Sequence, residues 1–182
     1  LGHQAALLSK KSPRPKFVDP FGEWMLKNYA PVKKYVGFHF DEYDKNIFTP
    51  VVRTAIRDAD VKDHGHYTIY LPAYDDKKLV QLLLKISKVR WHIFSKHTKK
   101  PYHVGRISVY PVSGHDFIES VVTSTGVLCG AGFETPAEVL HLNKKLLVVP
   151  MKSQYEQHCN AAALKKLGVP VLKKVKKKSI PK

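Results

Sequence analysis

The sequence predicts an α/β fold built on a doubly wound parallel sheet. From residue 66 onward, short β-branched segments alternate with amphipathic helical segments. The predicted strands are apolar along their whole length, as expected for strands that are buried on both faces. Parallel neighbours need crossover connections, and these are normally helical, which matches the alternation. An open sheet of this kind binds ligands at the carboxyl ends of its strands.

The first strand and helix of this region show the pattern. We expect a strand at residues 66–71 and a helix at residues 75–87, because apolar residues recur three and four positions apart in the second segment. The apolar stripe of this helix consists of Leu79, Leu82, Leu83 and Ile86. Gly168 is well placed to end the last predicted helix, at residues 154–167. Further strands are expected at residues 90–95, 106–110, 126–129, 145–150 and 169–175, and further helices at 116–124, 136–142 and 154–167.

Residues 1–60 have a different pattern. They contain a proline-rich stretch at 12–15, an aromatic helical stretch at 21–29 and a strand at 36–40. The polar segment 58–65 is expected to be a surface loop. We therefore divide the chain into a remnant of a preceding domain with its linker (1–60), a main α/β domain (61–176) and a basic tail (177–182).

Composition limits the classes of protein that the chain can represent. Its 182 residues carry 31 Lys and Arg against 15 Asp and Glu, a formal charge of +16. Such a surface attracts nucleic acid, an acidic lipid surface or a phosphate-bearing substrate, although a solvated lysine-rich surface explains the charge equally well. Cys129 and Cys159 lack the spacing of a disulfide framework or zinc site, which favours a reducing, cytoplasmic setting. No apolar run is long enough to cross a bilayer, so we expect no transmembrane helix.

One segment combines a predicted strand, a glycine-containing turn and a helix. Gly130 and Gly132 lack side chains where a phosphate would approach the backbone, and the helix that follows adds favourable partial charge. A structural explanation competes with this one. Thr135 and Glu138 fit a capping box with Pro136 at the first helical position, which accounts for these residues without any ligand.

A second capping box, residues 153–156, is predicted to open the next helix. It places Glu156, Gln157 and Asn160 near the carboxyl end of a second strand. Carboxylates and amides suit a sugar nucleotide, because vicinal hydroxyls donate paired hydrogen bonds to a carboxylate while an amide both donates and accepts. Gln157 is equally consistent with a solvated helix residue.

These segments together carry a family resemblance. The stretches Gly-Ala-Gly-Phe-Glu-Thr-Pro-Ala-Glu-Val-Leu, Lys-Lys-Leu-Leu-Val-Val-Pro-Met and Glu-Gln-His-Cys-Asn-Ala-Ala-Ala-Leu resemble the donor site of GT-B glycosyltransferases. The chain is similar to the lipid II-forming N-acetylglucosaminyltransferase and UDP-glucuronosyltransferase group, which carries Gly-x-x-Thr-x-x-Glu and, later, Gln-x-x-Asn-Ala. The matching residues are Gly132, Thr135, Glu138, Gln157, Asn160 and Ala161.

The resemblance implies a Rossmann-like, donor-binding C-terminal domain and transfer of a hexosyl group from a UDP-sugar to an acceptor hydroxyl, without a cofactor or bound metal. It assigns Glu138 to the ribose, the amides of residues 132–135 to the diphosphate, and Glu156 with Gln157 to the sugar. His3, followed by Gln4, resembles an acceptor-side turn of the group. The full set of implied donor-binding residues is Ser113, Gly114, Gly132, Phe133, Glu134, Thr135, Glu138, Glu156, Gln157 and Asn160.

The match to the group is incomplete. A Gly-Gly-Ser-like loop after the first strand is replaced here by residues 71–75. The resemblance places the general base on the preceding domain, so no base is named. We expect the intact protein to be active and this stretch alone to bind donor weakly and turn over little. A lipid-linked acceptor and peripheral contact with an anionic membrane, at its inner face, fit the charge.

Two rival functions and a metal site fit the sequence less well. A UDP-sugar epimerase shares the two-domain fold but needs acid and base side chains in its cleft. A basic nucleic-acid-binding module fits the charge, yet the sequence shows neither an aromatic stacking surface nor a recognition helix, so no nucleic acid is expected. Neither the pair His64 and His66 nor the pair His92 and His97 sits in a recognised ligand spacing together with nearby acids, so no metal is expected.

Overall fold

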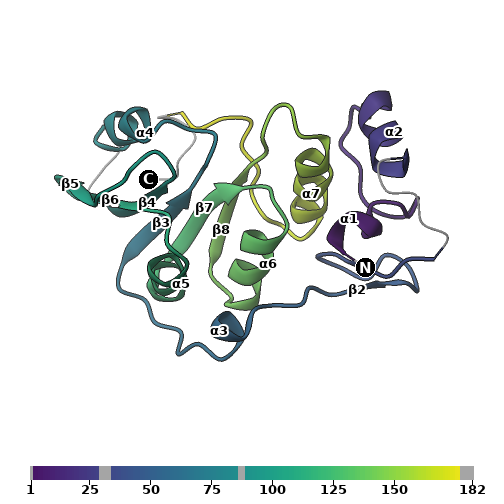
Figure 1. Cartoon of the computed structure of the whole chain (residues 1–182), viewed down its shortest axis with the longest axis horizontal. Helices are drawn as coiled ribbons and strands as arrows, with labels where there is room; N and C mark the ends of the chain where they lie inside the picture. Colours follow the sequence, from purple (N-terminus) through teal and green to yellow (C-terminus); the bar gives the residue numbers. More distant parts are fainter. Residues whose placement is uncertain (1, 29–33, 86–88, 177–182) are drawn as a thin grey trace.

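The computed structural model describes residues 2–28, 34–85 and 89–176. Its centre is a six-stranded sheet with the order β5-β6-β4-β3-β7-β8, in which all neighbours are parallel except β5 and β6 (Figure 1). The α/β class and the parallel core are confirmed. The strands are β3 (His66–Tyr70), β4 (Arg90–Ser95), β5 (Tyr102–Val104), β6 (Ile107–Pro111), β7 (Gly126–Gly130) and β8 (Lys145–Val149).

Helices cover both faces of the sheet. On one face lies α4 (Asp76–Leu83), whose Leu79, Val80 and Leu83 pack in a core cluster with Ile69 and Ile93 of the sheet. The opposite face is covered by α5 (Gly114–Thr123), α6 (Glu134–His141) and α7 (Tyr155–Lys166). The result is a three-layer arrangement of the doubly wound type.

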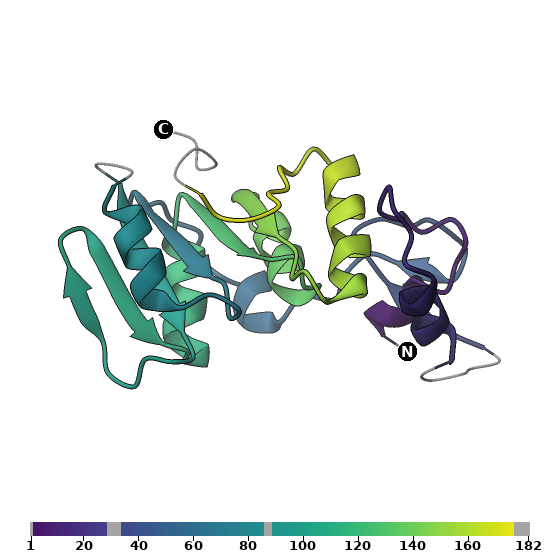
Figure 2. The same cartoon turned by 90° about the horizontal axis from the view of Figure 1, so that it is seen from above.

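The N-terminal unit comprises the described residues 2–28 and 34–60. Its residues 2–28 and 34–48 lie at the end of the long axis next to α7, whereas α3 (Thr54–Arg57) lies beside α5 (Figures 1 and 2). Its α2 contacts α7 directly, since the Tyr155 hydroxyl donates a 2.8 Å hydrogen bond to Glu23 Oε1. A Cβ on Gly22 would clash with the Tyr155 ring, so the two helices approach closely there. The elements are α1 (His3–Ala6), α2 (Pro20–Asn28), β1 (Gly37–Phe38), β2 (Ile47–Phe48) and α3 (Thr54–Arg57).

Several boundaries differ from those expected. The helix predicted at 75–87 ends at Leu83, and the predicted positions 86 and 87 lie outside the described residues, as do Tyr29 and the tail 177–182. The segment 169–175 is not a strand; a single bridge joins Val171 to Val148. The sequence pattern does not predict β5, which forms an antiparallel hairpin with β6 around Gly105, at φ +59°.

Neither predicted capping box forms. The N-cap of α6 is Phe133, so Thr135 and Pro136 lie inside the first turn rather than at its start. The N-cap of α7 is Gln154, and no side chain caps it. Helix geometry alone therefore does not account for these polar residues. Gly168 does end α7, with φ +83° as a left-handed C-terminal residue requires.

Both cysteines are buried and free, Cys129 in β7 and Cys159 in α7. Burial raises the pKa of the Cys129 thiol to about 12, so this group remains a neutral thiol at physiological pH. Among the residues that the structure describes, no helix has the length and apolar character needed to cross a bilayer.

Candidate functional site

The strand order predicts a binding position at the carboxyl ends of β3 and β7. The connection after β3 runs through α4 on one face of the sheet, whereas the connection from β6 to β7 runs through α5 on the opposite face. The connections therefore leave the sheet in opposite directions between β3 and β7. Open α/β sheets bind ligands where the connections separate in this way. The residues singled out in the sequence at the starts of α6 and α7 lie at this edge of the sheet (Figure 1).

The turn before α6 leaves room beside its backbone. A Cβ added at Gly132 would meet no atom within 4 Å, so there is open space where a side chain would stand at this residue. At the start of the helix, Phe133 is partly buried and Glu134 is exposed. An open helix N-terminus next to a glycine favours an anionic group.

Glu138 is already engaged by a residue of the N-terminal unit. Its carboxylate is 6% exposed and receives two hydrogen bonds from Arg53, Nε to Oε1 at 2.5 Å and Nη2 to Oε2 at 2.8 Å. The hydrogen bond to Glu138 raises the pKa of Arg53, which is itself half-exposed at 53%. The sequence does not point to Arg53, because no local pattern joins two residues so far apart in the chain.

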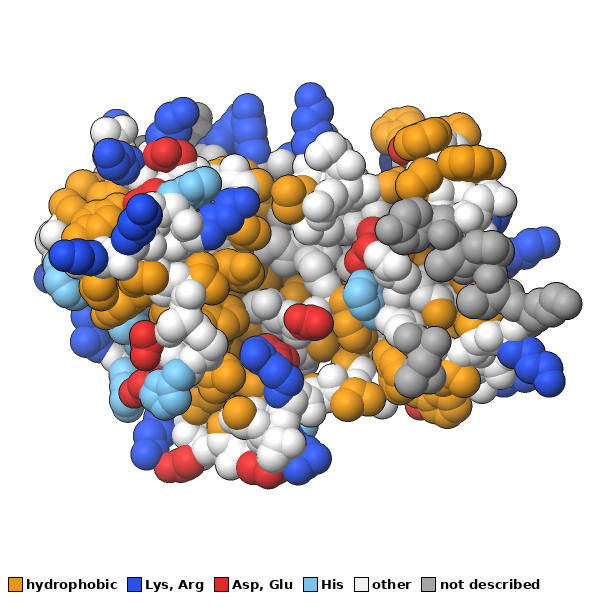
Figure 3. All heavy atoms as spheres, in the orientation of Figure 1, with side chains coloured by type: hydrophobic (Ala, Val, Ile, Leu, Met, Phe, Trp, Pro, Cys, Tyr) orange, Lys and Arg blue, Asp and Glu red, His pale blue; other side chains and the backbone are white. Residues whose placement is uncertain are grey.

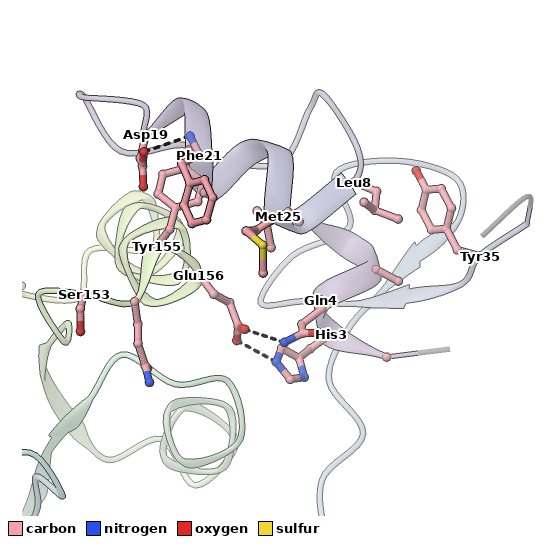
Figure 4. A pocket seen from close by; sticks show the side chains of 15 residues that line it. His3, Gln4, Leu8, Asp19, Phe21, Met25, Tyr35, Ser153, Tyr155 and Glu156 are labelled. Atoms are coloured by element: carbon pink, nitrogen blue, oxygen red, sulfur yellow. Dashed lines mark hydrogen bonds and ion pairs between the residues drawn. The ribbon is translucent and has the colours of Figure 1, made fainter. Parts of the chain in front are cut away.

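Glu156 at the start of α7 is held by the other end of the chain. His3 Nε2 lies 2.9 Å from its Oε1, and Gln4 Nε2 donates to its Oε2 at 2.8 Å (Figure 4). The hydrogen bond from His3 lowers the pKa of Glu156. The His3 ring also stacks on Phe133, with 4.9 Å between centroids and 6° between planes. His3, the predicted acceptor-side residue, therefore contacts residues at the starts of both α6 and α7.

Asn160 is fully buried and links three parts of the fold. Its Nδ2 donates to the Ala131 carbonyl at 3.1 Å, and its Oδ1 lies 3.0 Å from His39 Nε2. Tyr43 completes the network with its hydroxyl 3.2 Å from His39 Nδ1. Burial lowers the pKa of His39 to about 4, so the ring is neutral and Nε2–H can donate to the amide. Asn160 thereby fixes the turn after β7 from its buried side.

Three further residues that the resemblance implies, Gln157, Ser113 and Gly114, lie in or beside loops at the ends of strands. Gln157 Oε1 accepts from Met151 N–H at 3.0 Å and shapes the loop after β8. Ser113 caps α5 by accepting from Asp116 N–H, and the neighbouring Gly114 is exposed. These last two residues follow β6, which β4 and β3 separate from β7. They share the edge of the sheet with the α6 turn without touching it.

Two cavities flank the start of α7. The larger, of about 810 Å³, lies between α7 and the N-terminal unit, and Met25 and Phe21 extend toward its polar wall of His3, Gln4 and Glu156 (Figure 4). The smaller, of about 410 Å³, is bordered by the loop after β3 and by Lys152, Lys173 and Lys174, which the sequence does not suggest as a group.

The face seen in Figure 3 shows acidic side chains and a histidine in the hollow between the sheet domain and the N-terminal unit, with a basic side chain beside them. Many of the other lysine and arginine side chains on this face lie around its outline. Within the described parts of the chain, no group of three or more His, Cys, Asp or Glu could hold a metal ion. His66 and His92 stack with centroids 3.9 Å apart, and His66 bonds to Ser120.

The family model described as Glycosyl transferase family 1 matches residues 32–181, most of the chain. No curated protein gives a significant match. The matched span contains Arg53 and the α6 and α7 turns, whereas His3 and Gln4 precede it.

Proposed function

The chain belongs to glycosyl transferase family 1, whose GT-B fold its parallel sheet fits, and from that premise we propose that it binds the UDP-sugar donor of a hexosyl transfer to an acceptor hydroxyl. The donor would lie across the starts of α6 and α7. The observation that carries this proposal is the pair of carboxylates, Glu138 in α6 and Glu156 at the start of α7, in the two helices that begin at the edge of the sheet where such folds bind ligands.

Each carboxylate suits a different hydroxyl pair of the donor. A carboxylate accepts two hydrogen bonds from vicinal hydroxyls, as it accepts two from the Arg53 guanidinium here. We assign Glu138 to the ribose, and Glu156 with Gln157 to the sugar. Asn160 positions the turn rather than touching the donor, because its amide is buried and bonded to Ala131 and His39.

The diphosphate is assigned to the turn at residues 132–135. The open space at Gly132 and the partial positive charge of the α6 N-terminus both favour an anion there. Arg53 adds a permanent positive charge beside α6. If the ribose hydroxyls displaced Arg53 from Glu138, its guanidinium would be free to neutralise the negative charge of the departing nucleoside diphosphate. Four points stay predictions. They are transfer without a metal, the identity of the base as that of UDP, the contact of this base with Ser113 and Gly114, and a lipid-linked acceptor at an anionic membrane.

The larger cavity is the proposed acceptor side. It opens beside the Glu156 carboxylate, and its mixed apolar and polar wall includes His3. A histidine hydrogen-bonded to a carboxylate is an arrangement that can take a proton from a hydroxyl. His3 is therefore our candidate for activating the acceptor.

Calorimetric titration with UDP tests the proposal, with ADP and GDP as nucleotide controls. We expect selective UDP binding that Glu138→Gln weakens about tenfold or more, because hydrogen bonds to a charged group contribute about 1.5 to 3 kcal/mol. Glu119→Gln on the exposed surface of α5 is the matched charge control and should bind like the wild type.

A second variant separates binding from folding. The added Cβ of Gly132→Ala meets no atom within 4 Å, so its unfolding transition should match that of the wild type while its UDP affinity falls. A folded wild-type chain that binds no nucleotide would contradict the proposal. So would equal UDP affinities for the wild type and both site variants.

A further inference from the structure

Three side chains of the sheet meet one serine of α5. Ser120 is buried, and its carbonyl accepts from His66 Nε2–H of β3 at 3.1 Å and from the Thr68 hydroxyl at 3.0 Å. His92 Nδ1 of β4 lies 3.2 Å from the Ser120 hydroxyl. We call these four residues, His66, Thr68, His92 and Ser120, the histidine cluster. It joins the last turn of α5 to the sheet.

The Ser120 carbonyl depends on this cluster for its hydrogen bonds. It is one of the last four carbonyls of α5, which lack partners within a helix. The next N–H that could reach it, that of Ser124, bonds to the Val121 carbonyl at 3.3 Å instead. His66 and Thr68 therefore satisfy a carbonyl that would otherwise lie unpaired in the interior.

The two imidazoles of the cluster lie against each other. Their centroids are 3.9 Å apart and their planes 23° apart, and His66 is buried while His92 is half-buried. Burial lowers the pKa of His66 and lowers that of His92 to about 4, where the neighbouring His66 adds to the effect. Two positive charges at this separation repel each other, so at most one ring can be charged while the stack holds.

The charged and titratable groups that face the stacked pair are mostly basic. They are Arg90 on β4, His64 and Asp63 before β3, His103 on β5 and Tyr110 on β6, which stands edge-on to His92 at 5.4 Å. Asp63 alone among them favours a charged imidazole, at His66. These surroundings keep both rings neutral at pH 7.

A row of polar residues connects the cluster with solvent. Thr68 and Ser108 are the register partners of His92 on the neighbouring strands, and His103 on the edge strand β5 is the partner of Ser108. Exposure increases along this row, from buried Thr68 through half-buried His92 and Ser108 to exposed His103. Protons can therefore reach the pair from the edge of the sheet.

From this arrangement we infer that the histidine cluster is a pH-sensitive fastening of α5, which loosens from the sheet when one imidazole takes up a proton. A proton on His92 Nδ1 places a positive charge against the His66 ring, and water can solvate that charge once α5 moves away. The imidazole in the loosened state titrates near its ordinary value, so the fastening holds above pH 6.5 and weakens as the pH falls toward 4.

The fastening also bears on the start of α5. This helix begins beside Ser113 and Gly114, which the family resemblance assigns to the nucleotide base. Loosening would lower donor affinity in acid, and this consequence rests on the proposed donor site. The fastening itself does not, because it can be measured without nucleotide.

Amide hydrogen exchange of the whole chain at pH 7.5 and 5, corrected for intrinsic rates, tests the inference. In the wild type, protection of residues 114–123 should fall about tenfold or more relative to residues 76–83 of α4. The variant His66→Gln/His92→Asn keeps amide groups near the ring nitrogens but cannot titrate, so its relative protection should change less than about twofold. The control His97→Gln/His115→Gln loses two exposed imidazoles and should respond like the wild type.

Imidazole and amide NMR signals of the wild type give a second readout that needs no variant. The α5 amide signals should shift with the same midpoint as the His66 or His92 imidazole, below pH 6.5. Equal loss of protection in α4 and α5, an unchanged α5, or the same fall in His66→Gln/His92→Asn as in the wild type overturns the inference. Failure of UDP to bind would remove the donor site and leave the exchange result as it is.

Discussion

Glu138 in α6 and Asn160 in α7 make opposite kinds of contact with the N-terminal unit. At α6 the contact is an ion pair, in which half-exposed Arg53 covers the buried Glu138 carboxylate. Further along α7, beyond the contact of Glu156 with His3, lies a neutral network in the interior, where His39 meets fully buried Asn160. The Arg53–Glu138 ion pair, the first link, can separate into solvent without leaving a cavity. The His39–Asn160 hydrogen bond, the second link, cannot break without leaving buried polar groups that have no other hydrogen-bond partner in the fold.

This difference assigns the two links to different tasks. A neutral buried network rigidifies the fold, and its loss is expected to cost stability. An exposed guanidinium on a carboxylate contributes less to stability but occupies groups that a ligand can use. We therefore expect variants of the His39–Asn160 network to act on unfolding and variants of the Arg53–Glu138 pair to act on nucleotide binding.

The largest effect is expected from Asn160→Ala. It removes partners from the Ala131 carbonyl and from His39 Nε2, both in the interior, and the two losses together should lower the free energy of unfolding by about 4 kcal/mol. Urea denaturation measures the change. Lys165→Ala, exposed on the same helix, is the control and should stay within about 0.5 kcal/mol of the wild type. Equal effects of the two variants would remove the distinction between the links.

A second prediction concerns pH and the same network. His39 has a pKa lowered by burial to about 4, below the value of 6.5 for an unfolded chain. The unfolded state therefore takes up the proton first, so stability present above pH 6.5 is lost as the pH falls toward 4. Between pH 7.5 and 5 the His39 share should be about 2 kcal/mol.

The His39 share is measured by comparing urea denaturation of the wild type and His39→Gln at both pH values. The variant should lose less stability on acidification than the wild type does. Burial also lowers the pKa of His66 and His92, so some acid sensitivity should remain in the variant. His115→Gln, at an exposed position, should keep the wild-type dependence. Parallel curves for wild type and His39→Gln would refute the assignment.

The smallest effect on stability is expected at α6. Arg53→Gln leaves the Glu138 carboxylate without its charged partner, yet solvent reaches the site once the guanidinium is gone, so we expect a loss of about 1 kcal/mol. Thermal unfolding measures it. The same variant should change UDP affinity clearly more than Arg57→Gln, a control on the exposed end of α3. A stability loss as large as that of Asn160→Ala would make Arg53 a structural residue.

The sequence predicted the elements of the sheet better than the partners of its polar residues. Periodicity located β3, β4, β6, β7 and β8, because burial on both faces leaves a local apolar pattern. It missed β5, whose exposed residues follow no such pattern. The strand expected at 169–175 failed because apolar residues there pack under α4 while only Val171 pairs with the sheet.

For the candidate site, the motif found the positions and missed their neighbours. Glu138 and Glu156 were singled out from spacing along the chain, which local sequence encodes. Their partners Arg53 and His3 come from 85 and 153 residues away, and only the tertiary fold determines which side chains meet at such distances. The expected capping boxes failed for a related reason, since each helix begins at a residue other than the one that the pattern favours.

The most direct test of the donor site is a titration of the isotope-labelled chain with UDP, followed by amide and arginine side-chain NMR signals. We predict shifts at the amides of residues 131–135 and at the Arg53 Nε–H, which leaves the Glu138 carboxylate when the ribose binds. Shifts confined to other parts of a folded chain that binds UDP, with residues 131–138 and Arg53 unmoved, would contradict the donor site proposed at α6.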